Sequence, residues 1–596
     1  MTHHAHRRLA ALAFAAFLFL SACTSAGPAS DSERSGALTW GTWSNYSKHK
    51  PFLDLLERTC PDIELEFLSY TGGNATGYSW AQMRADDIPD IFITSRVLDR
   101  ELAKERLLDL SGYEFINHVS TAVLDQISID GGIYLLPVNN TMYGIYYNKT
   151  LMEEHDWEVP ANRSELEALC AEIRAEGLIP GVVGTMLTGG PFTAVLSLAK
   201  TSWFTTPMGV QWEQDFLTGE AAAQGTWEET MELVQAYIDM GMLTPDPEDR
   251  TSVELIADYL GNRKAVFCTV VQPVSYTTIP GASDELGMMP YIGEDGSKNV
   301  YIYSPFYYFG LSKRLAEPGN EEKLEDALEL LSLLYSPEGQ AALINETTPC
   351  VMGVLDNDPM AEDALLYDAQ LAQREGRVFP MTYENWDKVL SDMGQAFKEW
   401  FRGENGMDGP ACIARMDELQ RAHLEGSEDL YFCESTADFT LEETAVLLGK
   451  ALGSSVDADA ALIPLGGFHN GVETSAGVTG KLYAGRISSE VSATITTGYD
   501  GKYGIAELTG AQIQELLEAG FDPAGDGIPF PYVLVTKGGG TLEAETTFRV
   551  AFVMNGYTEE AARTYGIQEE PGSVREFLRT WLTEQRTVSP GGNPWE

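Results

Sequence analysis

Basic residues are scarce in this sequence of 596 residues. There are 39 lysines and arginines against 89 aspartates and glutamates, which gives a net charge of −50. A chain with this charge is repelled by phosphate backbones and by anionic lipid headgroups. We therefore expect no nucleic-acid partner, and we interpret the acidic excess as a solvated surface.

Histidine and cysteine are also rare, which limits metal chemistry. After residue 22 the histidines form no HxxxH or Asp-x-His pair, and they are His49, His118, His155, His423 and His469. Six cysteines follow Cys23 without a CxxC pair, so a zinc ribbon is not expected. The sequence does not decide which cysteines form disulfides, since six cysteines allow fifteen pairings. We expect no metal and no cofactor.

Motifs for catalysis are missing as well. The sequence contains no GxSxG elbow, no Walker loop and no GxGxxG opening a helix in a convincing context. With 89 carboxylates, close acid pairs must arise by chance, so they carry no signal for a glycosidase. No motif in the sequence therefore marks a catalytic centre.

One long apolar run is present, and it lies at the amino terminus. Arg7 and Arg8 precede LAALAFAAFLFL (residues 9–20), which is shorter than the roughly 20 apolar residues that a bilayer requires. The run fits the core of a secretion signal, with an ordinary cleaved signal or a buried helix as alternatives. It ends in LSAC, which resembles the bacterial lipobox. The resemblance implies a signal peptide at 1–22, diacylglycerol on Cys23 and a protein anchored to the membrane by this lipid. The small, polar residues of 23–36 read as a tether.

Strand-like and helix-like segments alternate over residues 37–430, which predicts α/β layers. Possible capping boxes are Ser164 with Glu167 and Thr226 with Glu229, and Gly177 and Gly241 stand where helices should end. The expected strands are LTWGTW (38–43), IELEFLSY (63–70), DIFIT (90–94), IYYN (145–148), AVFCTVV (265–271) and YYFGL (307–311).

An ordered series of segments in this region carries a resemblance. The series runs IPDIFIT, GGIYLLPVNNTMYGIYYNKTLMEEHDWEVP, GNRKAVFCTVV, YYFGLSK and LEDALELLSLLYSPEGQAAL. It resembles the extracellular solute-binding proteins of bacterial ABC importers, most of all the large sugar-binding type. The resemblance implies a hinged periplasmic-binding-protein-like fold of two α/β lobes joined by crossing strands. It also implies capture of a sugar or oligosaccharide on the extracytoplasmic face and its delivery to an ABC permease.

A sugar site needs aromatic rings for the C–H faces of the sugar, and amides or hydroxyls for its hydroxyl groups. Trp40 and Tyr307 lie on or beside strands and could instead belong to the core, while Asn139 and Asn140 could merely shape a turn. The candidates near strand ends are Trp40, Trp43, Tyr46, Ser95, Asn139, Asn140, Tyr143, Gln272, Tyr276, Ser304 and Tyr307.

A second, smaller α+β domain is expected at 435–596. Thr440 with Glu443 and Thr509 with Gln512 form capping boxes. The segments ADAALIPLGGF, GRISS, ELTGAQIQELLE and FRVAFVMNGY resemble the C-terminal substrate-specificity domain of 5'-nucleotidases. That family stacks a base between two aromatic rings, and Tyr499 falls at the first of these positions. His469 replaces the expected arginine and the GGDGY stretch is missing, so a module kept for packing or protein contact is an equal alternative.

The nucleotidase reaction also requires a dimetal domain in front of this module. A solute-binding region occupies that place here, so hydrolysis is not expected. The favoured hypothesis is a lipid-anchored receptor for a sugar. The alternatives are a receptor for a nucleoside or nucleotide and, less favoured, a surface nucleotidase.

Overall fold

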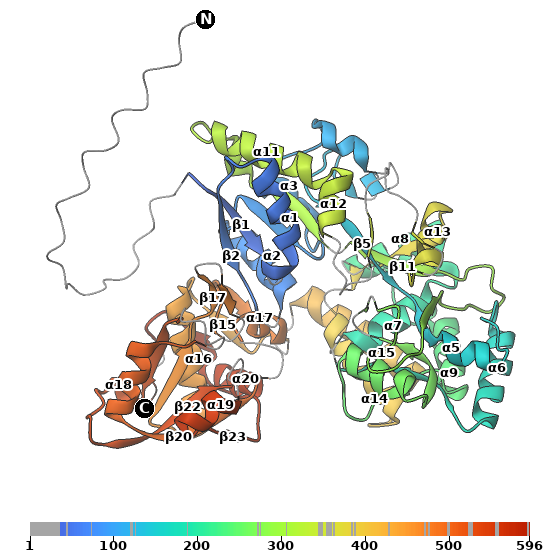
Figure 1. Cartoon of the computed structure of the whole chain (residues 1–596). Coiled ribbons are helices and arrows are strands. Elements are labelled where there is room, and N and C mark those ends of the chain that lie inside the picture. The colour runs from blue at the N-terminus through green and yellow to red at the C-terminus, as the bar shows by residue number, and fades with distance from the viewer. Residues whose placement is uncertain are drawn as a thin grey trace, which may run out of the picture. The chain divides into compact units, whose positions relative to one another are not determined.

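The computed structural model describes residues 36–595 with short gaps (Figure 1). Cys23, Trp43, Gln272 and Tyr499 fall outside the described residues, as do the side chains of Tyr46 and Asn139. Leu38–Glu596 forms one compact unit. The gaps are 43–45, 73, 120–122, 125–126, 187–188, 271–272, 275, 306, 344–349, 353–359, 362–363, 383–384, 387–388, 427–429, 470–471, 475–476, 497–500, 523–528, 555–558 and 593–594.

The first lobe is built on a five-stranded sheet of order β2-β1-β3-β12-β4. Its strands are β1 (Leu38–Thr42), β2 (Leu65–Ser69), β3 (Ile91–Thr94), β4 (Leu136–Pro137) and β12 (Tyr308–Leu311). Strand β1 runs parallel to β2 and β3, whereas β12 is antiparallel to β3 and β4. Strand β12 comes from a part of the chain far beyond the other four strands, which all lie within residues 38–137. All four residues of β3 are buried, which fits its sequence of three apolar residues followed by a threonine.

Helices from both ends of the first lobe's sequence pack on this sheet. Figure 1 shows α11 and α12 beside α1, and α1 contacts both. Asn74 and Asp99 cap α2 and α3 by accepting backbone N–H bonds of 2.9 Å from Gly77 and Leu102. The helices are α1 (Tyr46–Thr59), α2 (Ala75–Ala85), α3 (Arg100–Arg106), η1 (Glu114–His118), η4 (Lys313–Ala316), α11 (Glu321–Leu334) and α12 (Pro337–Leu343).

The second lobe has its own five-stranded sheet, of order β10-β6-β9-β7-β8. Strands β7, β8 and β9 are parallel, and β6 is antiparallel to β9 and β10. The strands are β6 (Ile145–Asn148), β7 (Ile179–Val183), β8 (Thr244–Pro245), β9 (Ala265–Thr269) and β10 (Leu286–Met289). Every residue of β9 is buried, so this is the central strand that its apolar sequence predicts.

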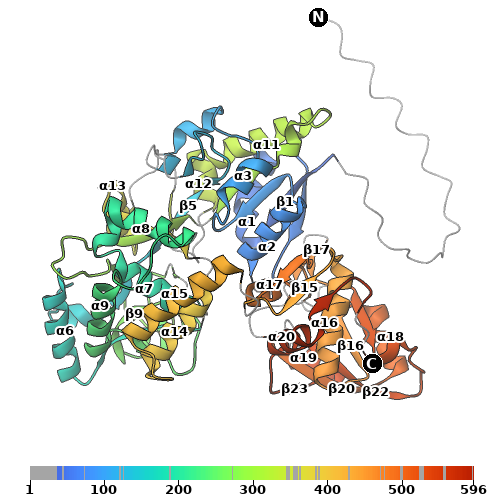
Figure 2. The same cartoon turned by 180° about the vertical axis from the view of Figure 1, so that it is seen from behind.

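The helices of the second lobe come from residues 149–261 and 367–425. Figure 2 shows α14 and α15 close to α7, and α14 contacts both of them. The helices are α5 (Lys149–Glu154), α6 (Arg163–Ala175), α7 (Gly190–Ala199), η2 (Trp203–Thr205), α8 (Pro207–Thr218), α9 (Glu228–Asp239), α10 (Ser252–Ile256), the π-helix η3 (Ala257–Gly261), α13 (Tyr367–Arg374), α14 (Leu390–Arg402) and α15 (Gly409–Glu425).

Two predicted helix starts in this lobe are wrong. Asn162, not Ser164, caps α6, because its side chain accepts the N–H of Glu165 at 3.0 Å. Thr226 does not cap α9, whose N-cap is Trp227 without a side-chain bond. The predicted ends are confirmed, since Gly177 and Gly241 follow α6 and α9 with φ values of 80° and 76°.

The C-terminal domain contains a five-stranded sheet, β21-β16-β22-β20-β23, and the smaller sheets β19-β15-β24 and β17-β18. Both predicted capping boxes are confirmed, at Thr440 and Thr509. The strands are β15 (Cys433–Ser435), β16 (Ala460–Pro464), β17 (Gly467–His469), β18 (Val472–Thr474), β19 (Gly485–Ile487), β20 (Tyr503–Thr509), β21 (Tyr532–Thr536), β22 (Thr547–Val553), β23 (Gln568–Glu570) and β24 (Thr587–Val588). The helices are α16 (Leu441–Ser455), α17 (Ser489–Thr494), α18 (Gly510–Ala519), η7 (Lys537–Gly539), α19 (Glu559–Tyr565) and α20 (Val574–Gln585).

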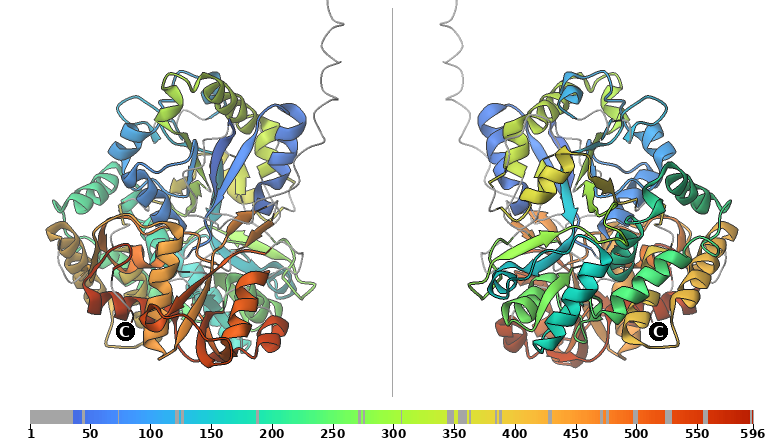
Figure 3. Two further views of the ribbon diagram at one scale, coloured as in Figure 1. Left: turned by 90° about the vertical axis from the view of Figure 1, so that its left-hand side faces the viewer. Right: turned by 90° about the vertical axis from the view of Figure 1, so that its right-hand side faces the viewer.

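Separate apolar cores support these groups of elements. Trp40, Phe309 and Leu330 belong to the core of the first lobe. Phe192 and Trp386 belong to a large core in the second lobe. The sheet and helices of the C-terminal domain enclose two further clusters. Figure 3 shows strands flanked by helices from either side. No helix within the described residues is long and apolar enough to cross a membrane.

Candidate functional site

A third sheet joins the two lobes, with the strand order β13-β5-β11-β14. Strand β5 (Asn139–Tyr143) leads from β4 of the first lobe to β6 of the second, and β11 (Tyr301–Pro305) leads back to β12. The outer strands are β13 (Cys350–Met352) and β14 (Val378–Pro380). We call these four strands the crossing sheet. The chain passes between the lobes along paired strands, as the hinged fold requires.

The alternative that Asn139 and Asn140 merely shape a turn is wrong, because both residues lie in strand β5. Asn140 lies opposite Pro305 of β11 and Val351 of β13, so strands on both sides pair with it. Tertiary pairing of this kind overrides the turn preference of asparagine. Gly144 then allows a close passage into β6, since a Cβ there would lie 2.6 Å from the carbonyl oxygen of Met289.

Polar side chains concentrate at the middle of the crossing sheet. Asn140 and Ser304 are 4% and 7% exposed, and Ser304 pairs with Thr141 in the register of β11 with β5. An amide and a hydroxyl on neighbouring strands can bond the hydroxyl groups of a sugar, so Asn140 and Ser304 are the predicted site residues that the crossing sheet brings together.

The predicted Ser95 lies at the carboxyl end of β3. Its Oγ is 2.5 Å from Oγ1 of Thr76 in α2, so these two hydroxyls are brought together from neighbouring elements. The turn beyond is fixed by the carbonyl oxygen of Arg96, which accepts bonds of 2.9 Å from Thr94 Oγ1 and Trp80 Nε1. Ser95 is half-buried and stands on a rigid turn.

Trp40 and Tyr307 lie in the core of the first lobe, which favours the core alternative over a ligand contact for both residues. Trp40 is 0% exposed, and its ring centroid lies 5.5 Å from Phe309 and 6.1 Å from Phe52. Tyr307 is 3% exposed and packs against His49 at 5.4 Å. A ring enclosed by other rings has no free face for a sugar, so both residues stabilise the lobe.

The remaining described candidates are two tyrosines of the second lobe. Tyr143 and Tyr276 are half-buried and pack against two different apolar clusters of that lobe. Trp43, Gln272 and the side chains of Tyr46 and Asn139 stay predictions, because they lie outside the described residues.

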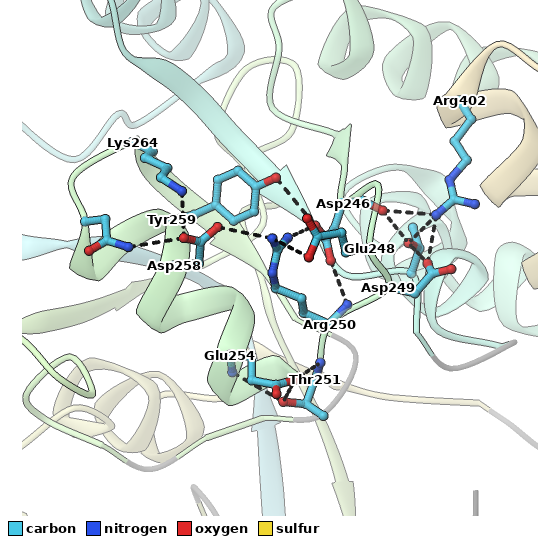
Figure 4. A network of polar contacts seen from close by, with 12 residues as sticks. Asp246, Glu248, Asp249, Arg250, Thr251, Glu254, Asp258, Tyr259, Lys264 and Arg402 are labelled. Atoms are coloured by element: carbon cyan, nitrogen blue, oxygen red, sulfur yellow. Dashed lines mark hydrogen bonds and ion pairs between the residues drawn. The ribbon is translucent and has the colours of Figure 1, made fainter. Parts of the chain in front are cut away.

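A charged network that sequence reasoning missed lies at the carboxyl ends of β7 and β8 (Figure 4). Asp246 follows β8 and is 0% exposed. Its carboxylate accepts the backbone N–H of Arg250 at 2.6 Å and the hydroxyl of Tyr259 at 3.5 Å. The Arg250 guanidinium pairs with Asp246 and also contacts Glu248 at 2.8 Å and Asp258 at 3.6 Å. The carboxyl edge of a parallel sheet is where open α/β folds bind ligands.

Asp249 extends this network to helix α14. Lys398 and Arg402 contact its carboxylate at 2.7 and 2.8 Å, and Arg402 also donates to the carbonyl oxygen of Asp246 at 3.0 Å. Burial raises the pKa of Asp249, but the bonds from Lys398 and Thr185 and the two cationic charges outweigh it and hold that pKa below its usual range. The network fixes α14 to the sheet edge. Its partners are about 150 residues apart, so no local pattern could reveal it.

Side chains that could bind a metal ion do not cluster within the described residues. No group of three or more His, Cys, Asp or Glu side chains there could hold an ion. Cys60, Cys170, Cys268, Cys412 and Cys433 are unpaired and buried. Burial raises the pKa of Cys60 and of Cys433 to about 11, which keeps these thiols protonated.

Several known proteins are similar to this chain in sequence or in fold. The chain is 26% identical over 160 residues to the multiple sugar-binding protein of Streptococcus mutans, a match that spans 26% of this chain and 38% of that relative's length. Among solved structures, the solute-binding protein RafE with raffinose superposes with a TM-score of 0.51 at 15% identity. A chitin oligosaccharide binding protein gives 0.51 at 19% identity.

Each of these two structures is covered over 100% of its chain by 65% of this one. At these identities they show the two-lobed fold alone, and about a third of this chain has no counterpart in either. The family assignment comes from the sequence match at residues 55–367, which is more than half of the chain. The chain belongs to the family of bacterial extracellular solute-binding proteins.

Proposed function

We propose that this protein is a receptor of an ABC importer that captures a sugar or oligosaccharide between its two lobes and delivers it to a permease. The crossing sheet carries this proposal. It connects two α/β lobes through β5 and β11 and places Asn140 and Ser304 on neighbouring strands. The relative from Streptococcus mutans is named for sugars, and RafE was solved with raffinose, which supports the sugar over other solutes.

The receptor performs no chemistry in this proposal. Solute favours the conformation in which both lobes contact it, because it binds that conformation better than any other. Phosphate release from AMP with added Mn²⁺ or Co²⁺ tests the competing assignment as a surface nucleotidase. Release above background would contradict a purely binding role.

Replacing Asn140 with alanine should weaken solute binding about tenfold, which corresponds to the loss of one hydrogen bond of roughly 1.4 kcal/mol. Asn140 is 4% exposed, so its amide is held in place before solute arrives. Titration calorimetry with the bound saccharide measures the change. Asn262→Ala is the matched control, since Asn262 is exposed and bonds Asp258 at 3.1 Å in the second lobe. Equal affinities for Asn140→Ala and the native protein would remove Asn140 from the site.

The receptor is proposed to be held at the membrane by a lipid on Cys23, on the basis of the LSAC sequence at residues 20–23. A short tether would keep it at a high effective concentration near its permease. Cys23→Ser should shift the protein from the membrane fraction to the soluble fraction and abolish incorporation of labelled fatty acid. Ser25→Ala, two residues further on, should leave both unchanged. Continued lipid labelling of Cys23→Ser would refute the anchor.

For the C-terminal domain, we propose a relationship to the C-terminal domain of 5'-nucleotidases, which rests on the ELTGAQIQELLE segment around α18. The domain either binds a nucleoside against Tyr499 or is a module kept for packing or protein contact. If it binds a nucleoside there, adenosine should raise the melting temperature of the native protein but not of Tyr499→Ala. An equal rise in both proteins would place nucleoside binding elsewhere.

A further inference from the structure

The C-terminal domain is docked on the first lobe through a buried polar interface. Tyr70, directly after β2, donates its hydroxyl to the carbonyl oxygen of Thr494 at 2.8 Å in a buried position. The neighbouring Thr71 donates its N–H to Thr479 Oγ1 at 2.8 Å. Gly480 permits this approach, since a Cβ there would lie 2.8 Å from the Tyr70 ring and 2.4 Å from the carbonyl oxygen of Thr494.

An aromatic and charged cluster extends the same interface along α2. Tyr70 and Tyr78 stack at 4.1 Å, and Tyr483 of the C-terminal domain lies 6.1 Å from Tyr78. Asp87, just beyond α2, accepts bonds of 2.8 Å from both Lys481 Nζ and Tyr483 Oη. The interface therefore combines ring packing with two bonds to one carboxylate.

The same domain also reaches the second lobe, through the short helix α17. The backbone carbonyl of Glu490 accepts a bond of 3.3 Å from Asn74 Nδ2 of the first lobe. Its side-chain carboxylate accepts a bond of 3.3 Å from Ser391 Oγ, in the first turn of α14 in the second lobe. Glu490 lies in the first turn of α17, where the dipole of that helix further stabilises its carboxylate. One residue thus contacts both lobes.

The covalent path adds another connection to the second lobe. Helix α15 ends at Glu425, and the carbonyl oxygen of Gly426 accepts a bond of 3.0 Å from Arg486 of β19. The guanidinium of Arg486 also lies 5.4 Å from the centre of the Tyr431 ring. The C-terminal domain is held near the end of α15 rather than by a long free linker.

We propose that the C-terminal domain is an internal strut that connects the two lobes in parallel with the crossing sheet and restricts their hinge motion. A hinge with one connection is free to open as far as its strands bend. A second connection, fixed to the first lobe at Asp87 and Tyr70 and to the second lobe at Ser391, narrows that range. The strut rests on the lobe movement of the proposed function, but its test requires no solute.

Pulsed electron paramagnetic resonance measures the distance between spin labels on the two lobes, in the full chain without solute. Labels are placed at the exposed positions Glu322→Cys on α11 and Glu172→Cys on α6, in a background with Cys23 and Cys350 replaced by serine. The five described native cysteines are buried and unreactive by comparison. We expect a narrow distance distribution for the intact interface.

Asp87→Ala, which removes the two bonds to its carboxylate from Lys481 and Tyr483, should broaden this distribution, and so should Ser391→Ala, which removes the bond from Ser391 to Glu490 of α17. Asp130→Ala is the matched control, because it breaks an exposed lysine–aspartate pair with Lys104 within the first lobe. It should leave the distribution narrow. Circular dichroism shows whether each variant is folded. Ser391→Ala removes one half-buried hydroxyl, so this variant still tests the strut if Asp87→Ala unfolds.

Unchanged distributions in folded Asp87→Ala and Ser391→Ala would overturn the strut. Equal broadening in Asp130→Ala would overturn it too, because the effect would then follow from any lost surface pair. The outcome is independent of the proposed solute. If no sugar binds but the distance distributions broaden in the variants, the strut is supported and only the proposed sugar ligand is contradicted.

Discussion

Glu213→Gln should destabilise the second lobe by about 3–5 kcal/mol, the usual effect of removing one partner from a buried ion pair. Lys200 and Glu213 are 0% and 1% exposed, and their charged groups lie 2.5 Å apart. Glu213 also accepts bonds from Trp386 Nε1 at 3.0 Å and Thr382 Oγ1 at 3.1 Å. Glutamine can still accept these bonds, but the Lys200 ammonium loses its counter-charge.

The surroundings of Lys200 explain why this effect should be large. Its ammonium lies 5.1 Å from the ring centre of Phe379 and 5.9 Å from that of Phe204, in a core rich in aromatic side chains. Such rings attract a cation weakly compared with a carboxylate. A buried ammonium without a carboxylate must lose its proton or draw in water, and both cost stability.

Urea unfolding followed by tryptophan fluorescence measures this change, because Trp386 and Trp227 lie in the same core. The control is Glu285→Gln, whose pair with Lys149 spans 3.4 Å and is 63% and 39% exposed. That variant should change stability by less than about 1 kcal/mol. Lys200→Met combined with Glu213→Leu should recover most of the loss. Similar effects of Glu213→Gln and Glu285→Gln would contradict the assignment of a buried, mutually dependent pair.

Trp40→Ala should destabilise the first lobe by about 3–5 kcal/mol, since it leaves a large cavity in a packed core. The side chain is 0% exposed and contacts Phe52, Phe67, Phe309 and His49. Thermal unfolding of the two variants Trp40→Ala and Trp40→Phe measures the effect. Phenylalanine should retain much of the packing and so lose less.

Trp157→Ala is the matched control for this prediction. Trp157 is half-buried and stacks on His155 at 4.3 Å, so its removal exposes little new cavity. The affinity of Trp40→Phe for solute is a second measurement, which distinguishes a core residue from a ligand contact. If Trp40→Phe abolished saccharide binding while leaving the melting temperature intact, Trp40 would be a ligand contact and its assignment to the core would be wrong.

The sequence predicts the regular elements well where the evidence is local. Apolar runs predict β3 and β9, and the capping boxes at Thr440 and Thr509 mark the starts of α16 and α18. A Thr or Ser with a Glu three residues later is not sufficient by itself. At Ser164 the neighbouring Asn162 caps the helix instead.

The candidate site was harder to predict because its geometry depends on distant pairing. The asparagine pair is compatible with a turn, whereas the structure pairs Asn140 with Pro305 of β11 and Val351 of β13. Trp40 lies in the middle of β1, and Phe52 of α1 and Phe309 of β12 pack against its ring. The link of Asp249 to Lys398 and Arg402 and the contacts of the C-terminal domain with α2 join residues far apart in the chain. No short pattern encodes such contacts.

The most direct test of sugar capture is the melting temperature of the native protein with and without saccharides. Raffinose, chitin oligosaccharides and simple hexoses form the panel, with adenosine as the competing class. A ligand that binds only the folded state adds about 2.7 kcal/mol of stability at a hundredfold excess over its Kd. We expect one saccharide to raise the melting temperature in a concentration-dependent way, and Asn140→Ala to reduce the rise. A shift with adenosine alone, or no shift with any saccharide at millimolar concentration, would contradict the assignment as a sugar receptor.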